Sequence, residues 1–448
     1  MIKLKKIGKL FLNIIHLILI FGQTNSNFKR LQYLLFILYY FGLYYCLTKI
    51  KFVSNSGLNK KSIFILFTIK ILVGISYGLV CNYFFTQASD YNNFENLSKI
   101  ETDNLFHNPK LFFTDIFYSN YKTYGDVFIA KESYWNDLPL NVILKILAFL
   151  NLINWGSFYI SNLFLNFVSF LGCVALYKVF KHIYINYNLP IIIGCFLLPS
   201  TLYYTSGVSK ELFVFAGLCF FLHALYFAVA NGFTAKKILV LTISFLLIFM
   251  IRNYIAVLLL PCAAIYILCY KLKTNAAKGF VAFLAIALIT IAIMDYFQIK
   301  NNPLNLITKR QDAFINLGEA KTNFNYDTLQ PTLKSFAAAT PKSFRNVFLS
   351  PLPTEFKSKI LLSYFVEMLC YYLLLASLFF YHKKNNHDKS FTIFTVFFSF
   401  IMMMVIGYTI TNFGALVRYR SLYLPFFITP ILCSIDWNKI ASRIGIKA

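Results

Sequence analysis

One apolar stretch decides the fold class of this chain. Residues 238–270 read ILVLTISFLLIFMIRNYIAVLLLPCAAIYILCY, in which Arg252 is the only charged residue. A membrane-spanning helix needs roughly 20 apolar residues, so this stretch is too long for one helix and just long enough for two short ones. It therefore predicts a helical hairpin that turns at Arg252, Asn253 and Tyr254.

The composition extends this interpretation to the whole chain. Of the 448 residues, 58% are hydrophobic, 19% are aromatic and only 13% are charged. Soluble domains average about 45–50% apolar and about 25% charged residues, so a soluble enzyme is excluded. The 51 Phe and 31 Tyr exclude a disordered chain. The net charge of +25 does not indicate nucleic-acid binding, because the basic residues are scattered over short loops.

About twelve apolar runs are long enough, or nearly so, to cross a bilayer. They lie near residues 8–22, 31–49, 62–85, 157–177, 190–206, 212–230, 237–251, 253–270, 279–296, 360–381, 391–411 and 421–435. We therefore predict an all-α, polytopic transmembrane bundle that forms a single domain over residues 1–448. The first run is interpreted as an uncleaved helix, because no small-residue cleavage site follows it.

The lysines predict which side of the membrane each loop faces. Lysine-rich tails and short loops alternate with lysine-poor connections, and positively charged loops stay on the cytoplasmic side. Both termini are therefore predicted to be cytoplasmic. The opposite side receives two long connections, residues 86–156 and 297–359, and we expect the chemistry to lie there.

Each long connection is predicted to contain helices that lie on the membrane surface. Residues 138–155 mix apolar positions with Asn and Lys, as an interfacial helix does. Residues 330–350 show a similar pattern, in which Pro331 and Pro341 are each expected to begin a short helix. The first connection also carries eight of the 17 acidic residues and is the one acidic region of a basic protein.

Asp90 is the candidate catalytic base. It follows the third predicted span directly, in the sequence QASDY (87–91), which places it at the membrane boundary. Partial desolvation there raises the pKa of a carboxylate toward the range that deprotonates a hydroxyl. The alternative is an ordinary acid at a helix end that faces lipid headgroups.

Lys210 and Glu211 are candidate substrate-binding residues. They follow a stretch rich in hydroxyls and aromatic rings, residues 199–209, at a turn on the same side as Asp90. Aromatic faces beside hydroxyls and acids are typical of sugar recognition. The tyrosines could equally belong to the interfacial belt, and Glu211 could be a helix N-terminal acid stabilised by the dipole.

Arginines on the predicted outer side are candidates for phosphate binding, because the guanidinium fork gives bidentate, charge-assisted hydrogen bonds. Arg418 and Arg420 lie in NFGALVRYR (412–420), and we expect this segment to be extended because Asn and Gly indicate that a helix has ended. Both side chains would then face one anion. Arg252 and Arg345 are further candidates, and anchoring at the headgroups is the alternative for Arg252.

Two ionisable residues lie inside predicted spans, Lys70 and Glu367. A charge at that depth should pair with another helix or line a cavity, and a structural ion pair between these two would explain both. The nine cysteines lie in or beside apolar runs without a CxxC pair, so we interpret them as small buried apolar residues.

Taken together, Asp90-Tyr91 and residues 199–211, 348–353 and 412–420 resemble the layout of polytopic glycosyltransferases of the GT-C type. The resemblance implies transfer of a sugar from a polyprenyl-phosphate-linked donor to a glycan or lipid-linked acceptor outside a bacterial inner membrane, in cell-envelope polysaccharide synthesis. By the same resemblance Asp90 would activate the acceptor hydroxyl, Tyr91 beside it would be a substrate-binding residue, and the arginines would hold the lipid phosphate. The chain differs from that layout in having its large first loop after the third span and Tyr91 in place of a second acid.

Two alternatives stay open. The layout is also similar to that of bacterial exopolysaccharide and O-antigen polymerases, which act on polyprenyl-diphosphate-linked repeat units. A non-enzymatic transporter of lipid-linked sugars would need charged residues along both halves of its helices, whereas polar residues other than Lys70 collect on one side. We therefore favour an enzyme. Its metal is unknown: a divalent cation could bind the acids of the first connection if folding brings two of them together.

The predicted topology can be tested with single cysteines in a Cys-free background. Asn104→Cys and Thr328→Cys are expected to react with a membrane-impermeant thiol reagent in intact cells, whereas Asn385→Cys should react only after permeabilisation. The reverse pattern would invert the predicted orientation and move the expected chemistry to the cytoplasm.

Overall fold

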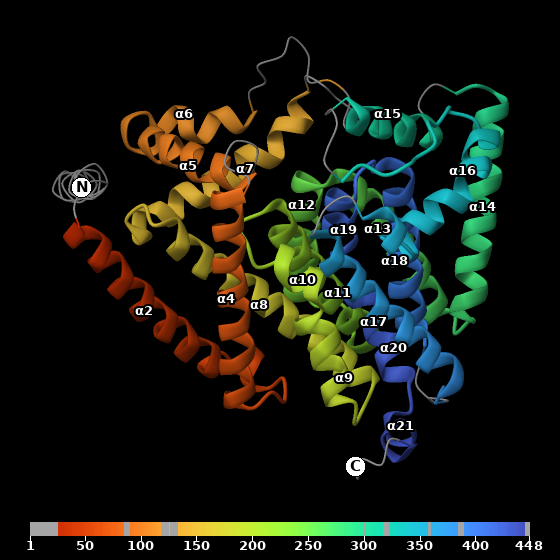
Figure 1. Ribbon diagram of the computed structural model, residues 1–448, viewed down its shortest axis with the longest axis horizontal. Helices are drawn as coiled ribbons and strands as arrows, with labels where there is room; N and C mark the ends of the chain where they lie inside the picture. The colour runs from red at the N-terminus through yellow and green to blue at the C-terminus, as the bar shows by residue number, and fades with distance from the viewer. Residues whose placement is uncertain are drawn as a thin grey trace. The chain divides into compact units, whose positions relative to one another are not determined.

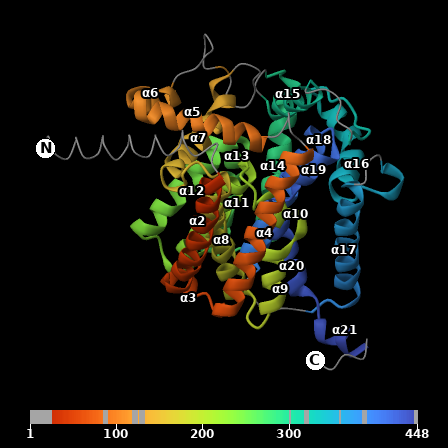
Figure 2. The same ribbon diagram turned by 60° about the vertical axis from the view of Figure 1, so that its left-hand side comes forward.

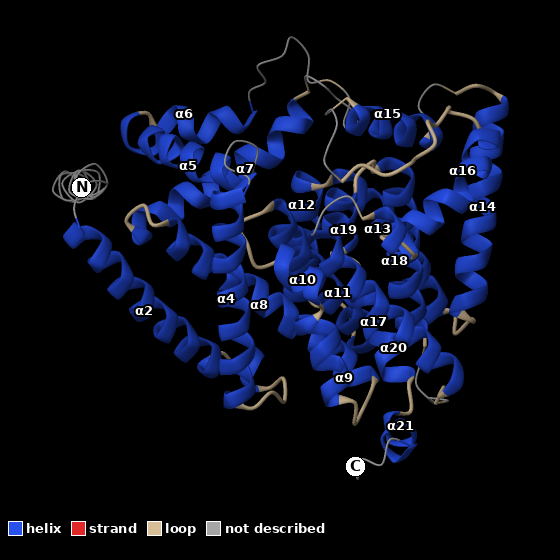
Figure 3. Ribbon diagram, viewed as in Figure 1, coloured by secondary structure: helices blue, strands red, loops and turns tan. Residues whose placement is uncertain are grey.

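The computed structural model describes residues 26–84, 90–117, 125, 133–299, 302–316, 322–356, 360–383 and 389–443. These residues form helices and loops, with two isolated bridges and no strand (Figure 3). Nine of the helices in this part of the chain are long and apolar enough to cross a membrane. The protein is therefore an all-α, multi-pass membrane protein. The run predicted at 8–22 lies outside the described residues.

The chain divides into two compact units. Figure 1 labels the helices of both in chain order. Unit 1 contains the described residues of 1–127, 132–174 and 203–217, and unit 2 those of 175–202 and 218–448. Unit 1 includes α2 (Ser26–Lys49), α3 (Lys51–Ser54), α4 (Lys60–Phe84), α5 (Asp90–His107), α6 (Pro109–Thr114), η1 (Asp115–Phe117), α7 (Tyr134–Asn154) and most of α8 (Phe158–Ile183).

Unit 2 holds the remaining helices, with α10 and α11 contributing residues to both units. These helices are α9 (Asn188–Ile192), η2 (Ile193–Leu197), α10 (Pro199–Tyr204), α11 (Lys210–Asn231), α12 (Ala235–Ile251), α13 (Asn253–Lys271), α14 (Ala276–Tyr296), α15 (Pro303–Ile315), α16 (Leu333–Phe348), η3 (Pro353–Glu355), α17 (Ile360–Phe380), α18 (Ser390–Thr409), α19 (Phe413–Arg420), α20 (Leu424–Ser434) and α21 (Trp437–Arg443). Figures 1 and 2 both place α15 at one end of this unit and α9 and α21 at the other.

The hairpin predicted from residues 238–270 is confirmed. Helices α12 and α13 meet at Arg252, whose backbone leaves the helical region with φ −146° and ψ 75°. Its N–H still donates to the carbonyl of Ile248 at 2.7 Å, so the turn loses little backbone hydrogen bonding. One charged residue in a long apolar run was therefore a sufficient signal for the turn.

Two predicted spans are shorter than expected, which corrects the predicted number. In place of a helix over 190–206, residues 188–197 end in the π-helical turn η2, and Leu198 is extended before Pro199 begins α10. A residue that precedes proline is disfavoured in the helical region, which explains the break. Similarly, α20 has 11 residues and is a short apolar helix, not a full span.

The helices of the two long connections differ from those predicted. Residues 333–348 form one helix through Pro341, not two pieces, because the buried side chains of Phe336, Ala339 and Val347 hold its apolar face. Helix α7 begins at its N-cap Ser133 and is itself long and apolar enough to span a membrane. Ahead of it, α5 and α6 lie across one end of α4 within unit 1 (Figures 1 and 2).

Within unit 1, α4 packs closely because it presents glycine where its neighbours approach. A Cβ atom at Gly74 would lie 2.6 Å from the Asn162 amide nitrogen and would also meet the backbone oxygen of Ser206. At Gly78 it would lie 2.5 Å from the Tyr91 hydroxyl. Small residues four apart allow such contacts between helices in a membrane.

Gly74→Ala is therefore expected to destabilise the protein by about 1–3 kcal/mol, because the added methyl group overpacks a site closed partly by backbone. Gly42→Ala is the matched control, since Gly42 also lies in an apolar helix of unit 1 and nothing lies within 4 Å of its Cβ position. Thermal unfolding in detergent measures both variants. Equal midpoints for the two would contradict the close packing described for α4.

Candidate functional site

Tyr419 in α19 is contacted by two guanidinium groups. Arg252 donates from Nη1 to the Tyr419 hydroxyl at 3.1 Å, and its Cζ lies 4.4 Å from the ring centroid. Arg418 donates from Nη2 to the same oxygen at 3.4 Å, with its Cζ 5.2 Å from the ring. One phenol therefore holds two arginines through hydrogen bonds and cation–π contacts.

A third arginine extends this group. Arg310 in α15 lies 5.4 Å from the ring of Phe314 and 5.5 Å from that of Tyr254, and Phe314 meets the Tyr419 ring edge-on at 5.9 Å. We call this set the arginine–aromatic cluster. It consists of Arg252, Arg310, Arg418, Tyr254, Phe314 and Tyr419.

The arginine–aromatic cluster concentrates positive charge at a partly accessible place in unit 2. Arg252 is 8% exposed, whereas Arg310 and Arg418 are half-buried. Among the described residues, no carboxylate forms an ion pair with Arg310. Only aromatic rings contact the guanidinium of Arg310 among the described residues, so its N–H donors are available to an anion, and a phosphate suits their planar fork.

The structure shows that the expectation for residues 412–420 was wrong. They form helix α19, because the Asn412 side chain caps its N-terminus by accepting from the Ala415 N–H at 2.8 Å. On a helix, the side chains of residues two positions apart point in nearly opposite directions. Arg418 therefore reaches the arginine–aromatic cluster, and Arg420 does not.

Arg420 instead lies in the interior of unit 2 and is 2% exposed. Its Nη1 donates to the carbonyls of Val347 at 2.8 Å and Ser350 at 3.2 Å, where α16 ends. Its Nε and Nη2 atoms, and the Ser350 hydroxyl, have no hydrogen-bond partner among the described residues. Burial of a guanidinium with open donors is costly, so Arg420 is a second candidate for anion contact.

Glu367, in α17, lies close enough to Arg420 to act on its charge. Its Oε1 accepts from the Ser200 N–H at 3.0 Å, the Ser200 hydroxyl at 2.9 Å and the Tyr371 hydroxyl at 2.6 Å. Lys70 donates instead to the Thr205 carbonyl at 3.0 Å and to the Thr205 and Ser206 hydroxyls at 3.3 Å. Glu367 and Lys70 thus contact different groups. These contacts do not include the predicted ion pair between Glu367 and Lys70.

Arg345 contacts an acid, Glu355, and is not part of the arginine–aromatic cluster. Its Nη2 forms an ion pair with the Glu355 carboxylate at 2.8 Å, and its side chain is 45% exposed. Glu355 also accepts from the Leu352 N–H at 2.8 Å, so this pair stabilises the loop that follows α16. An exposed pair of this kind contributes little stability, and its observed role is local.

In unit 1, Asp90 is the first residue of α5 and is half-buried. Tyr91 is 1% exposed, with its ring against Phe158 at 4.7 Å and Tyr77 at 6.0 Å. Burial raises the pKa of the Tyr91 phenol, and the nearby Tyr159 adds to the shift, so Tyr91 stays neutral at physiological pH. Tyr91 thus packs the start of α5 and thereby places Asp90.

Lys210 and Glu211 begin α11, with Lys210 half-buried and Glu211 1% exposed. Tyr77 connects their neighbourhood to Tyr91, because its ring also lies 5.2 Å from that of Tyr203. The structure therefore brings the start of α5 near the segment before α11 within unit 1. Tyr77 was not predicted, because an aromatic residue in an apolar run carries no signal of its partners.

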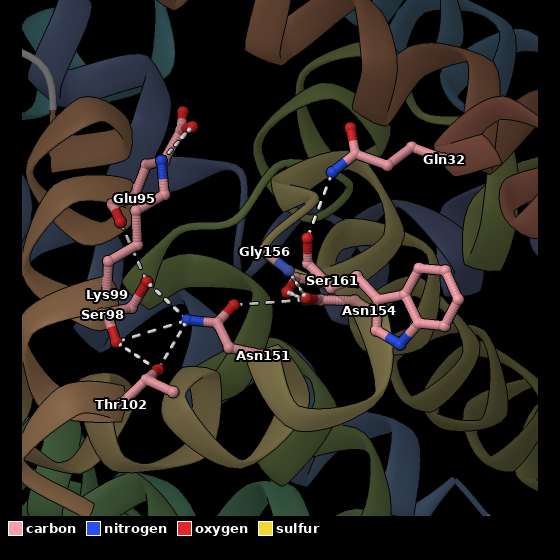
Figure 4. Close-up of polar contacts among 10 residues, drawn as sticks. Gln32, Glu95, Ser98, Lys99, Thr102, Asn151, Asn154, Gly156 and Ser161 are labelled. Carbon is pink, nitrogen blue, oxygen red and sulfur yellow. Dashed lines mark hydrogen bonds and ion pairs between the residues drawn. The ribbon is translucent and has the colours of Figure 1, made fainter. Parts of the chain in front are cut away.

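Unit 1 also contains a polar network that the sequence did not reveal (Figure 4). Asn151 donates to the Ser98 hydroxyl at 3.3 Å and the Thr102 hydroxyl at 3.0 Å. Asn154 donates to Asn151 at 3.3 Å and to the Ser161 hydroxyl. These bonds join α5, α7 and α8 through side chains that are almost fully buried.

Further buried polar side chains lie along α8, which is long enough to span a membrane. Asn162, Asn166 and Ser169 are 0–1% exposed, and Asn166 donates to the carbonyl of Asn162 at 2.9 Å and to that of Ser206 at 2.5 Å. Ser169 donates to the Thr205 carbonyl at 3.2 Å. The sequence analysis singled out Lys70 among polar residues inside the spans and did not single out these three side chains of α8. Their spacing of three or four residues was the available signal.

Two acids of the first connection do converge, and a lysine lies between them. The Lys145 ammonium is 2.5 Å from the Glu101 carboxylate and 2.7 Å from that of Asp115, and it lies 4.3 Å from the Phe112 ring centroid. Across the described ranges, no three His, Cys, Asp or Glu side chains form a group that could hold a metal ion.

These features define the class of the protein as an all-helical, multi-pass membrane protein with an arginine-rich candidate site in unit 2. Comparison of the chain with protein families, curated proteins and solved structures finds no match.

Lys145→Met is expected to destabilise the protein by on the order of 2 kcal/mol, because it leaves two largely buried carboxylates facing each other. Lys99→Met is the matched control, since Lys99 forms one exposed pair with Glu95 at 3.2 Å. Thermal unfolding measures both. Adding Glu101→Gln and Asp115→Asn to Lys145→Met should restore part of the loss, and a loss of the same size in both single variants would argue against a buried ion pair.

Proposed function

We propose that this protein is a membrane glycosyltransferase that transfers a sugar from a polyprenyl-phosphate-linked donor to an extracytoplasmic acceptor. The observation that carries the proposal is the arginine–aromatic cluster. Three guanidinium groups gather on aromatic rings in a helical membrane protein, and Arg310 has no carboxylate partner among the described residues. A phosphate at a membrane boundary is the anion that such a group of donors fits best.

The charge of the arginine–aromatic cluster would serve both binding and catalysis. In sugar transfer from a lipid phosphate, the bond between the anomeric carbon and the phosphate oxygen breaks and the phosphate gains negative charge. Guanidinium donors fixed by aromatic rings stabilise that charge without reorganising. Arg252 and Arg418 hold the same phenol, so they would act from two directions on one phosphate.

Asp90 is proposed as the base that removes the acceptor's proton. It starts a helix, is half-buried and stands beside the buried Tyr91, so its position is well defined within unit 1. A fixed carboxylate with partial access to solvent meets the geometric need of a general base. Its role rests on the resemblance together with this placement.

A transporter of lipid-linked sugars is the second candidate function, and the polar side of α8 favours it. Asn162, Asn166 and Ser169 are buried in a helix of membrane-spanning length, beside contacts of Lys70 with Thr205 and Ser206. Polar groups along a helix interior are what a path for a sugar headgroup needs. They also join helices in a membrane, which is why the enzyme is preferred.

Arg418→Lys is expected to weaken donor binding several-fold, because lysine keeps the charge and loses the planar fork. Titration of a polyprenyl-phosphate-linked sugar into purified protein in nanodiscs measures the effect. Arg443→Lys is the control, since Arg443 also contacts a tyrosine, Tyr381, at 3.1 Å but lies in α21 at the other end of unit 2. Wild-type binding by Arg418→Lys, Arg310→Lys and Arg252→Lys would refute the phosphate role of the arginine–aromatic cluster.

The donor series in the same assay separates the enzyme classes. Tighter binding and turnover of polyprenyl-diphosphate-linked repeat units than of the monophosphate donor would identify a polymerase. Movement of a lipid-linked sugar across the vesicle membrane without transfer would identify the transporter.

Asp90→Asn is expected to lower turnover by about 10²-fold or more with donor binding preserved, because the amide keeps the size of the side chain and cannot accept the proton. Asp103→Asn is the control on the same helix, with an exposed carboxylate paired to His107 at 3.1 Å. Near-normal turnover of Asp90→Asn would leave this residue a headgroup-facing acid.

A further inference from the structure

Unit 2 has a cavity of about 750 Å³ at the end that holds α9 and α21, away from α15 and the arginine–aromatic cluster. It is lined by the turn before α9, the end of α17 and the segment that joins α20 to α21. Ligand sites in proteins commonly have volumes of about 300–1,000 Å³. None of the residues proposed to act in sugar transfer lines this cavity.

The wall of the cavity is fixed by backbone pairing. The N–H of Lys383 donates to the Ser434 carbonyl, and the N–H of Asp436 donates to the Tyr381 carbonyl, both at 2.9 Å. Arg443 at the end of α21 donates to the Tyr381 hydroxyl at 3.1 Å and stacks on its ring at 5.5 Å. These contacts tie the end of α17 to α21, so the cavity is built by residues far apart in sequence.

The charge of the cavity is carried by Lys383. Its ammonium lies 5.7 Å from the Tyr187 ring centroid, and no carboxylate among the described residues forms an ion pair with it. The acid of the lining, Asp436, accepts from the Lys439 N–H at 3.3 Å and lies 3.8 Å from its ammonium. A negative group in the cavity would therefore meet an ammonium that has no carboxylate partner among the described residues, and Asp436 in the lining lies near Lys439 instead.

The rest of the lining suits a lipid at the membrane surface. Tyr187 and Trp437 are amphipathic ring residues of the type that lies at headgroup level. Leu189 is 66% exposed and continues the apolar wall to the outside of the unit, where acyl chains can lie. Basic pockets between helices on the cytoplasmic side bind the head groups of anionic lipids, and this end carries the lysines that predict that side.

We propose that this cavity binds the phosphate headgroup of an anionic phospholipid of the surrounding bilayer, with Lys383 as the phosphate contact and Leu189 against the acyl chains. The lipid is neither donor nor acceptor in the proposed reaction. The site therefore stands whether or not the protein is a glycosyltransferase.

Phosphatidylglycerol and phosphatidylcholine, each in fluorescent form, are titrated into the full-length protein in detergent micelles. The wild type should bind phosphatidylglycerol more tightly, and Lys383→Gln should weaken that binding about fivefold, as loss of one surface lysine does. Lys389→Gln is the matched control, because Lys389 is exposed, comes just before α18 and does not line the cavity. It should leave the dissociation constant unchanged.

A second variant keeps the test independent of charge. Asn438→Trp fills the cavity from an exposed position on α21 and should weaken binding of phosphatidylglycerol without lowering the unfolding temperature. Equal effects of Lys383→Gln and Lys389→Gln, or wild-type binding by Asn438→Trp, would overturn the proposal. Competition by free glycerol phosphate at the affinity of the lipid would also overturn it, because the ligand would then be a soluble phosphate.

Discussion

The hydrogen bonds of Arg420 to the carbonyls of Val347 and Ser350 determine how the functional part of unit 2 is arranged. They tie the end of α19 to the end of α16, where the Arg420 side chain is 2% exposed. Thr201 adds a bond of 2.6 Å to the Ser421 carbonyl, directly after α19. With α19 fixed in this way, its other side must present Arg418 and Tyr419 to Arg252. The buried arginine thus sets the position of the accessible one.

The same constraint shapes unit 1. Backbone and side-chain polar atoms inside a membrane protein must find partners within the protein. Lys70 meets this need with a carbonyl and two hydroxyls, and Asn166 with two carbonyls. Because glycine at position 74 leaves no Cβ, α4 comes close enough to the segment around Ser206 for these bonds to form. A larger side chain at position 74 would therefore break polar contacts as well as disturb the packing of α4.

The fold could be predicted from the sequence wherever a single residue type decides it. Arg252 splits an apolar run, so the hairpin of α12 and α13 was predicted correctly. The broken helix over 188–204 was not, because its length alone suits a span and the interruption is a local effect before Pro199. Asn412 was interpreted as a sign that a helix had ended. The same side chain caps the next helix, and only the spatial structure distinguishes these roles.

The candidate site was harder to predict, because its contacts join positions far apart in sequence. Arg252 and Tyr419 are separated by 167 positions, and neither residue carries a sign of the other. Arg310 was missed for this reason, although its spacing of four from Phe314 on a helix was a usable signal. Arg345 was predicted from its charge, whereas the structure pairs it with Glu355. The charge of a residue and its location on a loop identify it as a candidate binding residue. Its contacts in the structure decide whether it can bind a ligand.

The two ends of unit 2 carry different cations, and the difference fits the two ligands proposed for them. The arginine–aromatic cluster has guanidinium groups, whose planar forks would fix the direction of the phosphate in the proposed reaction. The cavity at the other end has Lys383, a point charge that attracts a headgroup without orienting it. A reacting phosphate needs direction, because the bond that breaks must face the acceptor, whereas a bound bilayer lipid needs only to stay. Replacing Arg418 by lysine should therefore be damaging, and replacing Lys383 by arginine should be mild. This contrast would distinguish the proposed site for a reacting phosphate from the proposed lipid site.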